Sequence, residues 1–134
     1  MIFCDTNVLV SAVTDHERKP SAMAVFERGQ RVYVPLLCRY EIAQVLGKAA
    51  RNRWIDPTEV GIAAATAREF VSYEVPPVDA AVYVAASVRP NIPSYDAVWV
   101  YHAGQLGLRV VTFDRKLINA VPNIAISPED YLAS

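Results

Sequence analysis

Short apolar segments that alternate with helical stretches constrain the fold of this chain most strongly. Strand-like segments lie at residues 2–4, 31–34, 109–113 and 123–126. Strands separated by helices pair in parallel, and a parallel sheet is covered by helices on both faces. The sequence therefore predicts a three-layer α/β/α domain with a central parallel sheet and right-handed crossovers.

Residues with capping chemistry mark the helices expected between these strands. Helices are expected at residues 8–13, 22–28, 36–54, 57–73, 78–88, 95–106 and 117–120. Residues 56–59 (Asp-Pro-Thr-Glu) combine a helix cap, a first-turn proline and a capping-box glutamate. Ser94 is expected to cap the helix that begins at residue 95, and Gly107 to end it in the left-handed conformation.

Length and composition bound the class of protein. A chain of 134 residues suffices for one domain, so residues 1–134 are expected to form a single domain with a substantial core. The content of 53% hydrophobic and 20% charged residues excludes intrinsic disorder as the main state. A net charge of −1 provides no basic field over the whole molecule. Recognition of nucleic acid must therefore rest on a local patch or on a metal ion.

The sequence indicates a cytoplasmic protein that does not associate with membranes. No stretch approaches the roughly 18 apolar residues that cross a bilayer, and the first residues do not resemble a signal peptide. Cys4 and Cys38 lie in apolar segments, as expected of buried thiols in a reducing compartment. The wide sequence separation of these cysteines from His16 and His102 argues against a zinc site.

Four acidic side chains lie in apolar surroundings, namely Asp5, Glu41, Asp96 and Asp114. Asp5 and Asp114 each follow a predicted strand, and ligands of α/β proteins bind at the carboxyl ends of parallel strands. Glu41 is expected in the middle of a helix, on an apolar stripe, and Asp96 in the first turn of an apolar helix. Each has an ordinary alternative: a helix cap for Asp5 or Asp114, the helix dipole for Asp96, and a buried arginine for Glu41.

One shared cation would explain all four acids together. Carboxylates in one cleft repel each other, and a hard divalent ion relieves that repulsion. Mg²⁺ is the expected ion, with Mn²⁺ as the alternative, and such a site can activate water toward a phosphodiester. Thr6 and Asn7 could bind a metal-bound water or a phosphate oxygen, although helix-start chemistry explains them equally well. For Thr112, strand alternation could point the side chain away from the cleft.

The acidic motifs resemble, in their order and spacing, those of PIN-domain ribonucleases. The motifs are Asp5-Thr6-Asn7, Tyr40-Glu41-Ile42-Ala43, Tyr95-Asp96-Ala97-Val98 and Val111-Thr112-Phe113-Asp114-Arg115-Lys116-Leu117. The resemblance covers residue 2 to about residue 126, and the size is similar to that of VapC-type toxins. It implies a metal-dependent endoribonuclease that forms a homodimer and is inhibited by a small cognate antitoxin. It also implies that Asp5, Glu41, Asp96 and Asp114 are the catalytic, metal-binding set, with Thr6 and Asn7 as polar neighbours.

Basic and aromatic side chains near these motifs suggest how substrate or partners bind. Arg115 and Lys116 directly follow Asp114 and are expected to contact substrate phosphates. A second basic cluster at residues 48–54 also fits the C-terminus of a helix, where cations interact favourably with the dipole. The aromatic side chains exceed what a small core encloses, so some are expected at a dimer interface or an antitoxin groove.

A different class of function remains as the alternative. The chain could be a non-catalytic α/β module that binds RNA or protein, which would show no affinity for metal ions. An aspartyl-nucleophile phosphatase is disfavoured because the second residue after Asp5 is Asn7 rather than aspartate. A ribonuclease that uses the 2′-hydroxyl as nucleophile needs a paired acid and base, and His16 and His102 offer no such pair.

Overall fold

The strands of the chain form one parallel sheet with β1 at its centre. The structure is a computed structural model that describes residues 1–88 and 92–134. The strand order is β3-β2-β1-β4-β5, and every neighbouring pair is parallel. The strands are β1 (Ile2–Cys4), β2 (Val32–Pro35), β3 (Tyr73–Val75), β4 (Val110–Val111) and β5 (Ala125–Ile126). The predicted central parallel sheet is confirmed.

Helices connect the strands and follow the last one. In the described residues these are α1 (Thr6–Val13), α2 (Lys19–Glu27), α3 (Cys38–Arg51), the short 3₁₀ helix η1 (Pro57–Glu59), α4 (Val60–Glu69), α5 (Asp79–Val88), α6 (Ser94–Leu106), α7 (Arg115–Ala120) and α8 (Pro128–Ala133). No helix in the described part of the chain is long and apolar enough to cross a membrane.

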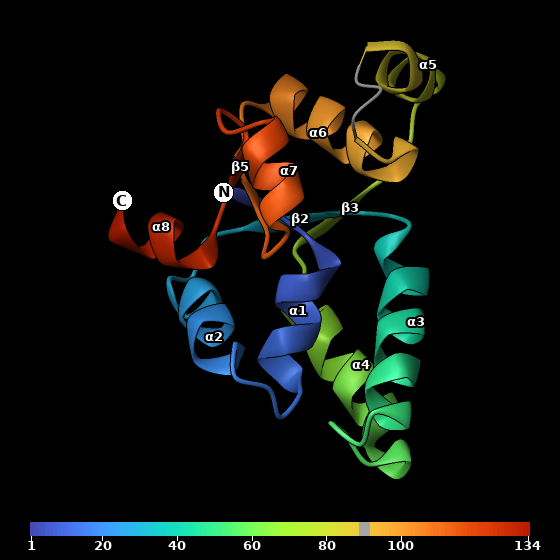
Figure 1. Cartoon of the computed structure of the whole chain (residues 1–134), viewed down its shortest axis with the longest axis vertical. Coiled ribbons are helices and arrows are strands. Elements are labelled where there is room, and N and C mark those ends of the chain that lie inside the picture. The colour runs from blue at the N-terminus through green and yellow to red at the C-terminus, as the bar shows by residue number, and fades with distance from the viewer. Residues whose placement is uncertain (89–91) are drawn as a thin grey trace.

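Helices cover the sheet on both faces, as predicted. Cys4, Val34 and Val111 contribute to one buried cluster with side chains of α1 to α4. Phe3 and Val110 point to the other face, where they pack with Ala103 of α6. Helices α5 and α7 pack in turn against α6. Figure 1 shows α5 and α6 above the sheet and α1 to α4 below it, which gives the three-layer α/β/α arrangement.

Local capping signals fix several helix ends. The backbone N–H of Thr58 donates to Asp56 Oδ1 at 2.9 Å, which confirms the predicted cap, although the first turn is 3₁₀. Gly107 ends α6 with φ = 66°, in the left-handed conformation that glycine adopts without steric cost. The prediction for Ser94 was wrong by one position: Ser94 is the first residue of α6, and Pro93 precedes it as the cap.

The segment after α4 corrects the sequence-based expectation. The helix expected to reach residue 73 ends at Glu69, and Tyr73–Val75 forms the edge strand β3. Tyr73 pairs with Tyr33 of β2 in the sheet register. Glu74 forms ion pairs with both Arg39 of α3 and Arg68 of α4. These contacts with distant segments explain why local pattern did not reveal the strand.

Helix α8 was also not predicted from sequence. Ser127 caps it by accepting a hydrogen bond from the N–H of Asp130 at 3.0 Å. The guanidinium of Arg28, just after α2, donates to the carbonyl oxygens of Tyr131 and Leu132 at 3.2 and 2.7 Å. The last helix is therefore held against α2 by hydrogen bonds to carbonyls at its C-terminus.

Candidate active site

The candidate site lies at the carboxyl edge of the sheet, around Asp5. Asp5 directly follows the central strand β1, and its N–H donates to Val111 O of β4 at 3.0 Å. Asp114 lies three residues beyond the end of β4. Because β1 and β4 are parallel neighbours, the two strands deliver both acids to the same edge.

Asp5 is partly buried and is held by neutral hydrogen-bond donors. Its Oδ2 accepts from Thr112 Oγ1 at 2.7 Å and from Asn7 Nδ2 at 3.3 Å. Asp5 occupies the N-cap position of α1, but its side chain makes no capping hydrogen bond. Burial raises the pKa of Asp5 above its ordinary value, while the hydrogen bond from Thr112 opposes that rise. The backbone N–H groups of Thr6 and Asn7 also act to lower this pKa, so Asp5 faces the start of α1 without making the hydrogen bond of a cap.

Asp114, in contrast, caps a helix. Its Oδ1 accepts from the N–H groups of Lys116 and Leu117 at 2.9 and 3.3 Å, which begins α7. Within the described residues no hydrogen bond involves its Oδ2. The capping interaction fixes the orientation of the carboxylate and leaves one oxygen for a ligand.

Glu41 lies in the first turn of α3, not in the middle of a helix as the sequence suggested. The reason is that α3 begins at Cys38, so the N-terminal end of the helix dipole favours a carboxylate at this position. Glu41 Oε1 accepts from Thr6 Oγ1 at 3.3 Å. For the alternative of a buried arginine partner, the described residues show no ion pair of Glu41, and Arg39, two positions before it, pairs with Glu74.

Asp96 lies in the first turn of α6. Burial, followed by the charges of Asp5 and Asp114, raises its pKa to about 6. Burial, followed by the charge of Asp5, also raises the pKa of Glu41, and the charge of Asp96 adds to the rise. Hydrogen bonds also connect the segments that carry the acids: Thr6, next to Asp5, donates to Glu41, and Thr112 donates to Asp5 and accepts from the N–H of Asp114. Together with the effects of Asp5 and Asp114 on the pKa of Asp96, these contacts indicate that the four acids lie in one region.

The chemistry of this set fits a hard divalent cation, although its spacing is loose. All four groups offer carboxylate oxygens, and none forms an ion pair with a lysine or arginine in the described part of the chain. Within residues 1–88 and 92–134, however, no three of these side chains stand close enough to form a ready-made metal shell.

Thr112 is a site residue about which the sequence reasoning was undecided. The side chain of Thr112 is fully buried, and its hydroxyl donates to Asp5 and accepts from the N–H of Asp114 at 3.0 Å. Asn7 joins the same network, because its Nδ2 donates to Thr112 Oγ1 and its Oδ1 accepts from Phe113 N–H at 3.2 Å. Strand β4 ends at Val111, so the alternation of β4 does not apply to Thr112.

Cationic side chains lie on the β4 side of the acids. Arg115 and Lys116 are exposed at the start of α7, directly after Asp114. Arg18, which the sequence reasoning missed, lies with its guanidinium carbon 4.9 Å from the centre of the Phe113 ring. The second basic cluster is not part of this site. Lys48 and Arg51 occupy the last turn of α3, at the opposite end of the helix from Glu41.

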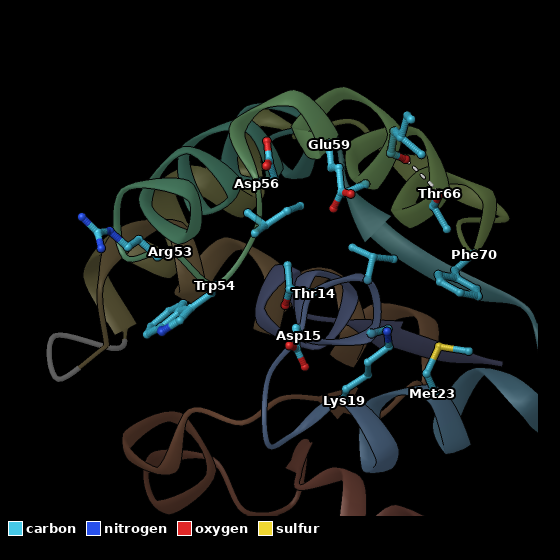
Figure 2. Close-up of a pocket in the computed structure, with 15 residues that line it drawn as sticks. Thr14, Asp15, Lys19, Met23, Arg53, Trp54, Asp56, Glu59, Thr66 and Phe70 are labelled. Carbon is cyan, nitrogen blue, oxygen red and sulfur yellow. Dashed lines mark hydrogen bonds between the residues drawn. The ribbon is translucent and has the colours of Figure 1, made fainter.

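A groove in the described part of the chain lies away from the four acids. It has a volume of about 700 Å³ and is bounded by the end of α1, by α2, by η1 and α4, and by residues 53–56. Figure 2 shows Lys19 and Met23 on one side of this groove and Glu59 and Phe70 on the other. Apolar side chains and charges of both signs therefore line the same groove.

The fold and the site together define an α/β/α protein with an acidic cluster at the carboxyl edge of a parallel sheet. A family model described as PIN domain matches residues 2–122, so the chain belongs to the PIN domain family. Proteins of this family are generally nucleases, and these generally use divalent metal ions.

Several solved structures share the fold at low sequence identity. PAE2754 from Pyrobaculum aerophilum is 23% identical with a TM-score of 0.75, and the match covers 98% of this chain and 86% of that one. A toxin–antitoxin complex from Klebsiella pneumoniae is 17% identical with a TM-score of 0.64, covering 96% and 98%. VapBC2 from Rickettsia felis, bound to a promoter DNA fragment, is 15% identical with a TM-score of 0.68, covering 95% and 98%. No curated protein matches the sequence.

Proposed function

We propose that this chain is a Mg²⁺- or Mn²⁺-dependent endoribonuclease and the toxin of a toxin–antitoxin pair. The observation that carries the proposal is the cluster of four mutually repelling carboxylates at the carboxyl edge of a PIN fold. Neutral hydroxyl and amide groups hold Asp5, and no basic side chain pairs with the cluster in the described residues. Such a site suits a cation that binds together with a phosphodiester.

Each residue of the site has a distinct role in this proposal. Asp5, Glu41, Asp96 and Asp114 would hold the metal ion, which supplies an activated water and polarises a phosphoryl oxygen when bound. Thr112 and Asn7 keep Asp5 and the backbone of the Asp114 segment in register. Thr6 orients Glu41. Arg115 and Lys116 would contact the phosphates of the strand.

Cleavage of a structured RNA mixture by the purified protein tests the proposal. We expect cutting with Mn²⁺ or Mg²⁺, none with EDTA, and none by the variant Asp5→Asn in either metal. The variant Asp130→Asn removes an exposed acid from the first turn of α8 and serves as the control that should cut normally. Full activity of Asp5→Asn would contradict the assignment of the site.

The alternative is a non-catalytic module that binds RNA or protein through the same fold. It is separated from the nuclease by calorimetric titration with Mn²⁺, which does not depend on knowing the RNA target. The nuclease requires binding that Asp5→Asn weakens. An undetectable heat at millimolar metal, together with no cleavage, would favour the module.

We further propose that a small antitoxin occupies the groove of Figure 2. Structural neighbours of this chain include a toxin–antitoxin complex. The groove offers apolar contacts, such as Phe70, between charges of both signs, such as Lys19 and Glu59. That surface suits a short amphipathic helix. The variant Ile62→Asp places a charge on the groove at a side chain that is 71% exposed, and it should abolish co-purification with a co-expressed antitoxin.

We propose that two copies of the chain form a homodimer. We also propose that the protein acts in the cytoplasm and that residues 1–134 form one domain. Val78, Val82 and Tyr83 are exposed apolar or aromatic side chains at or near α5, and they form the candidate surface. Sedimentation equilibrium over a range of protein concentrations tests this, and a monomer mass throughout would contradict it.

A further inference from the structure

Two exposed tyrosines immediately precede acids of the candidate site. Tyr40 and Tyr95 are the residues before Glu41 and Asp96, and their exposed fractions are 72% and 67%. Each tyrosine lies in the first turn of its helix, α3 or α6. Glu41 accepts from Thr6, the residue after Asp5, at 3.3 Å, and Trp99, one helical turn after Asp96, lines the same small cavity as Asp5 and Pro35. The first turns of α3 and α6 therefore both lie beside Asp5. The tyrosines therefore stand at the rim of the candidate site.

The surroundings of these two tyrosines differ from those of Tyr73 and Trp54. Tyr73 stacks edge-on with Tyr33, and Trp54 with His16, at centroid distances of 5.7 and 5.4 Å. In the described part of the chain, neither Tyr40 nor Tyr95 has a ring partner or a side-chain hydrogen bond. Two ring faces beside the site are thus open to a ligand.

The topology separates the Tyr40 ring from the free cations. Tyr40 follows β2, on one side of the central strand, whereas Arg115 and Lys116 follow β4, on the other side. A strand that crosses the acidic cluster could therefore meet aromatic rings on one side and cations on the other. Aromatic faces accept bases of any sequence by stacking, but only when those bases are unpaired.

We propose that Tyr40 and Tyr95 form a stacking platform for unpaired bases of a single-stranded RNA, whose phosphates contact Arg115 and Lys116. The inference rests on the proposed ribonuclease function for the identity of the ligand. It assigns substrate preference to two residues outside the set of acids. A duplex cannot use the platform, because its bases are stacked on each other.

Binding of a fluorescein-labelled oligouridylate, followed by anisotropy, tests the platform without relying on cleavage. The parent protein is the Asp5→Asn variant in EDTA, so that neither metal nor turnover affects the result. Tyr40→Ala and Tyr95→Ala should each weaken binding at least about fivefold, the lower limit for loss of one stacked base. Tyr40→Phe and Tyr95→Phe keep the ring and should retain binding. Trp54→Ala removes an exposed aromatic at the far end of α3 and should change nothing.

The design separates failure of the platform from failure of the nuclease assignment. Cleavage by the wild-type protein, combined with unchanged binding by both alanine variants, overturns the platform and leaves the nuclease intact. Tyrosine-dependent binding without metal-dependent cleavage overturns the nuclease and supports the platform. Undetectable binding by the parent protein also overturns the platform. If the alanine variants instead convert a dimer to a monomer in sedimentation, the tyrosines belong to an interface between copies and the inference is wrong.

Discussion

Neutralising Asp96 should stabilise the metal-free protein. The pKa of Asp96 is raised from 3.8 to about 6 in the folded state. At neutral pH the side chain is ionised in both states, but its charge costs more free energy in the folded state than in the unfolded state. A difference of about two pH units corresponds to roughly 3 kcal/mol. Solvent screening of this partly exposed side chain reduces the effect to about 1–2 kcal/mol. The variant Asp96→Asn keeps the shape and removes the charge, so its free energy of unfolding at pH 7.5 should rise by that amount.

The raised pKa of Asp96 determines how the stability difference should change with pH. The wild-type protein carries the full cost of the charge above pH 6, and the cost falls as pH drops from about 6 toward 3.8, since the folded state takes up the proton first. Urea unfolding in EDTA should therefore show the largest difference between Asp96→Asn and wild type at pH 7.5 and almost none near pH 4. Asp130→Asn, at an exposed first-turn aspartate of α8, is the matched control and should gain no stability. Equal stability of Asp96→Asn and wild type at pH 7.5 would refute the reasoning.

Three further predictions concern hydrogen bonds and charges of the site and of strand β3. Thr112→Val removes the donor to Asp5 and the acceptor for Asp114 N–H, so it should cost about 1–3 kcal/mol in urea unfolding and lower cleavage at least about tenfold. Lys116→Ala should weaken RNA binding and reduce the slope of log affinity against log salt by about 1, as measured by anisotropy. Glu74→Gln loses two arginine ion pairs and should cost about 1 kcal/mol at low salt, with a smaller difference in 1 M salt during urea unfolding.

The elements predicted best are those with strong local signals. Residues 2–4 are apolar and end at an acid, and they form β1 as expected. Gly107 and Asp56 act at helix ends through their own backbone freedom or side chain, so sequence alone identifies them. Strand β3 has three residues, pairs with β2, and carries Glu74, whose partner Arg39 lies 35 residues earlier in the chain. No local pattern encodes those partners, which is why a helix was expected to extend over Tyr73.

In the candidate site too, some features could be predicted from the sequence and others could not. The position of an acid directly after a strand follows from topology, so the proximity of Asp5 to Asp114 was predictable. The position of Glu41 within its helix was not, because the start of α3 is set by the turn after β2. The dual role of Thr112 also depends on where a two-residue strand ends. The distances between the four acids are harder still to predict from sequence, because they depend on charge repulsion and on bound cations.

The groups that contact the four acids are those expected of a site that receives a cation, and they differ from those of a structural ion-pair network. In the described residues no lysine or arginine forms an ion pair with these acids, and Arg39, two positions before Glu41, binds Glu74 instead. The acids are positioned by hydroxyl, amide and backbone N–H groups, which orient a carboxylate without cancelling its full charge. A structural network would be most stable with its charges paired, whereas we expect this cluster to become more stable when a charge is removed or a divalent ion binds. Mn²⁺ should therefore raise the melting temperature of wild type by more than that of Asp96→Asn, and an equal rise in the two proteins would place the metal elsewhere.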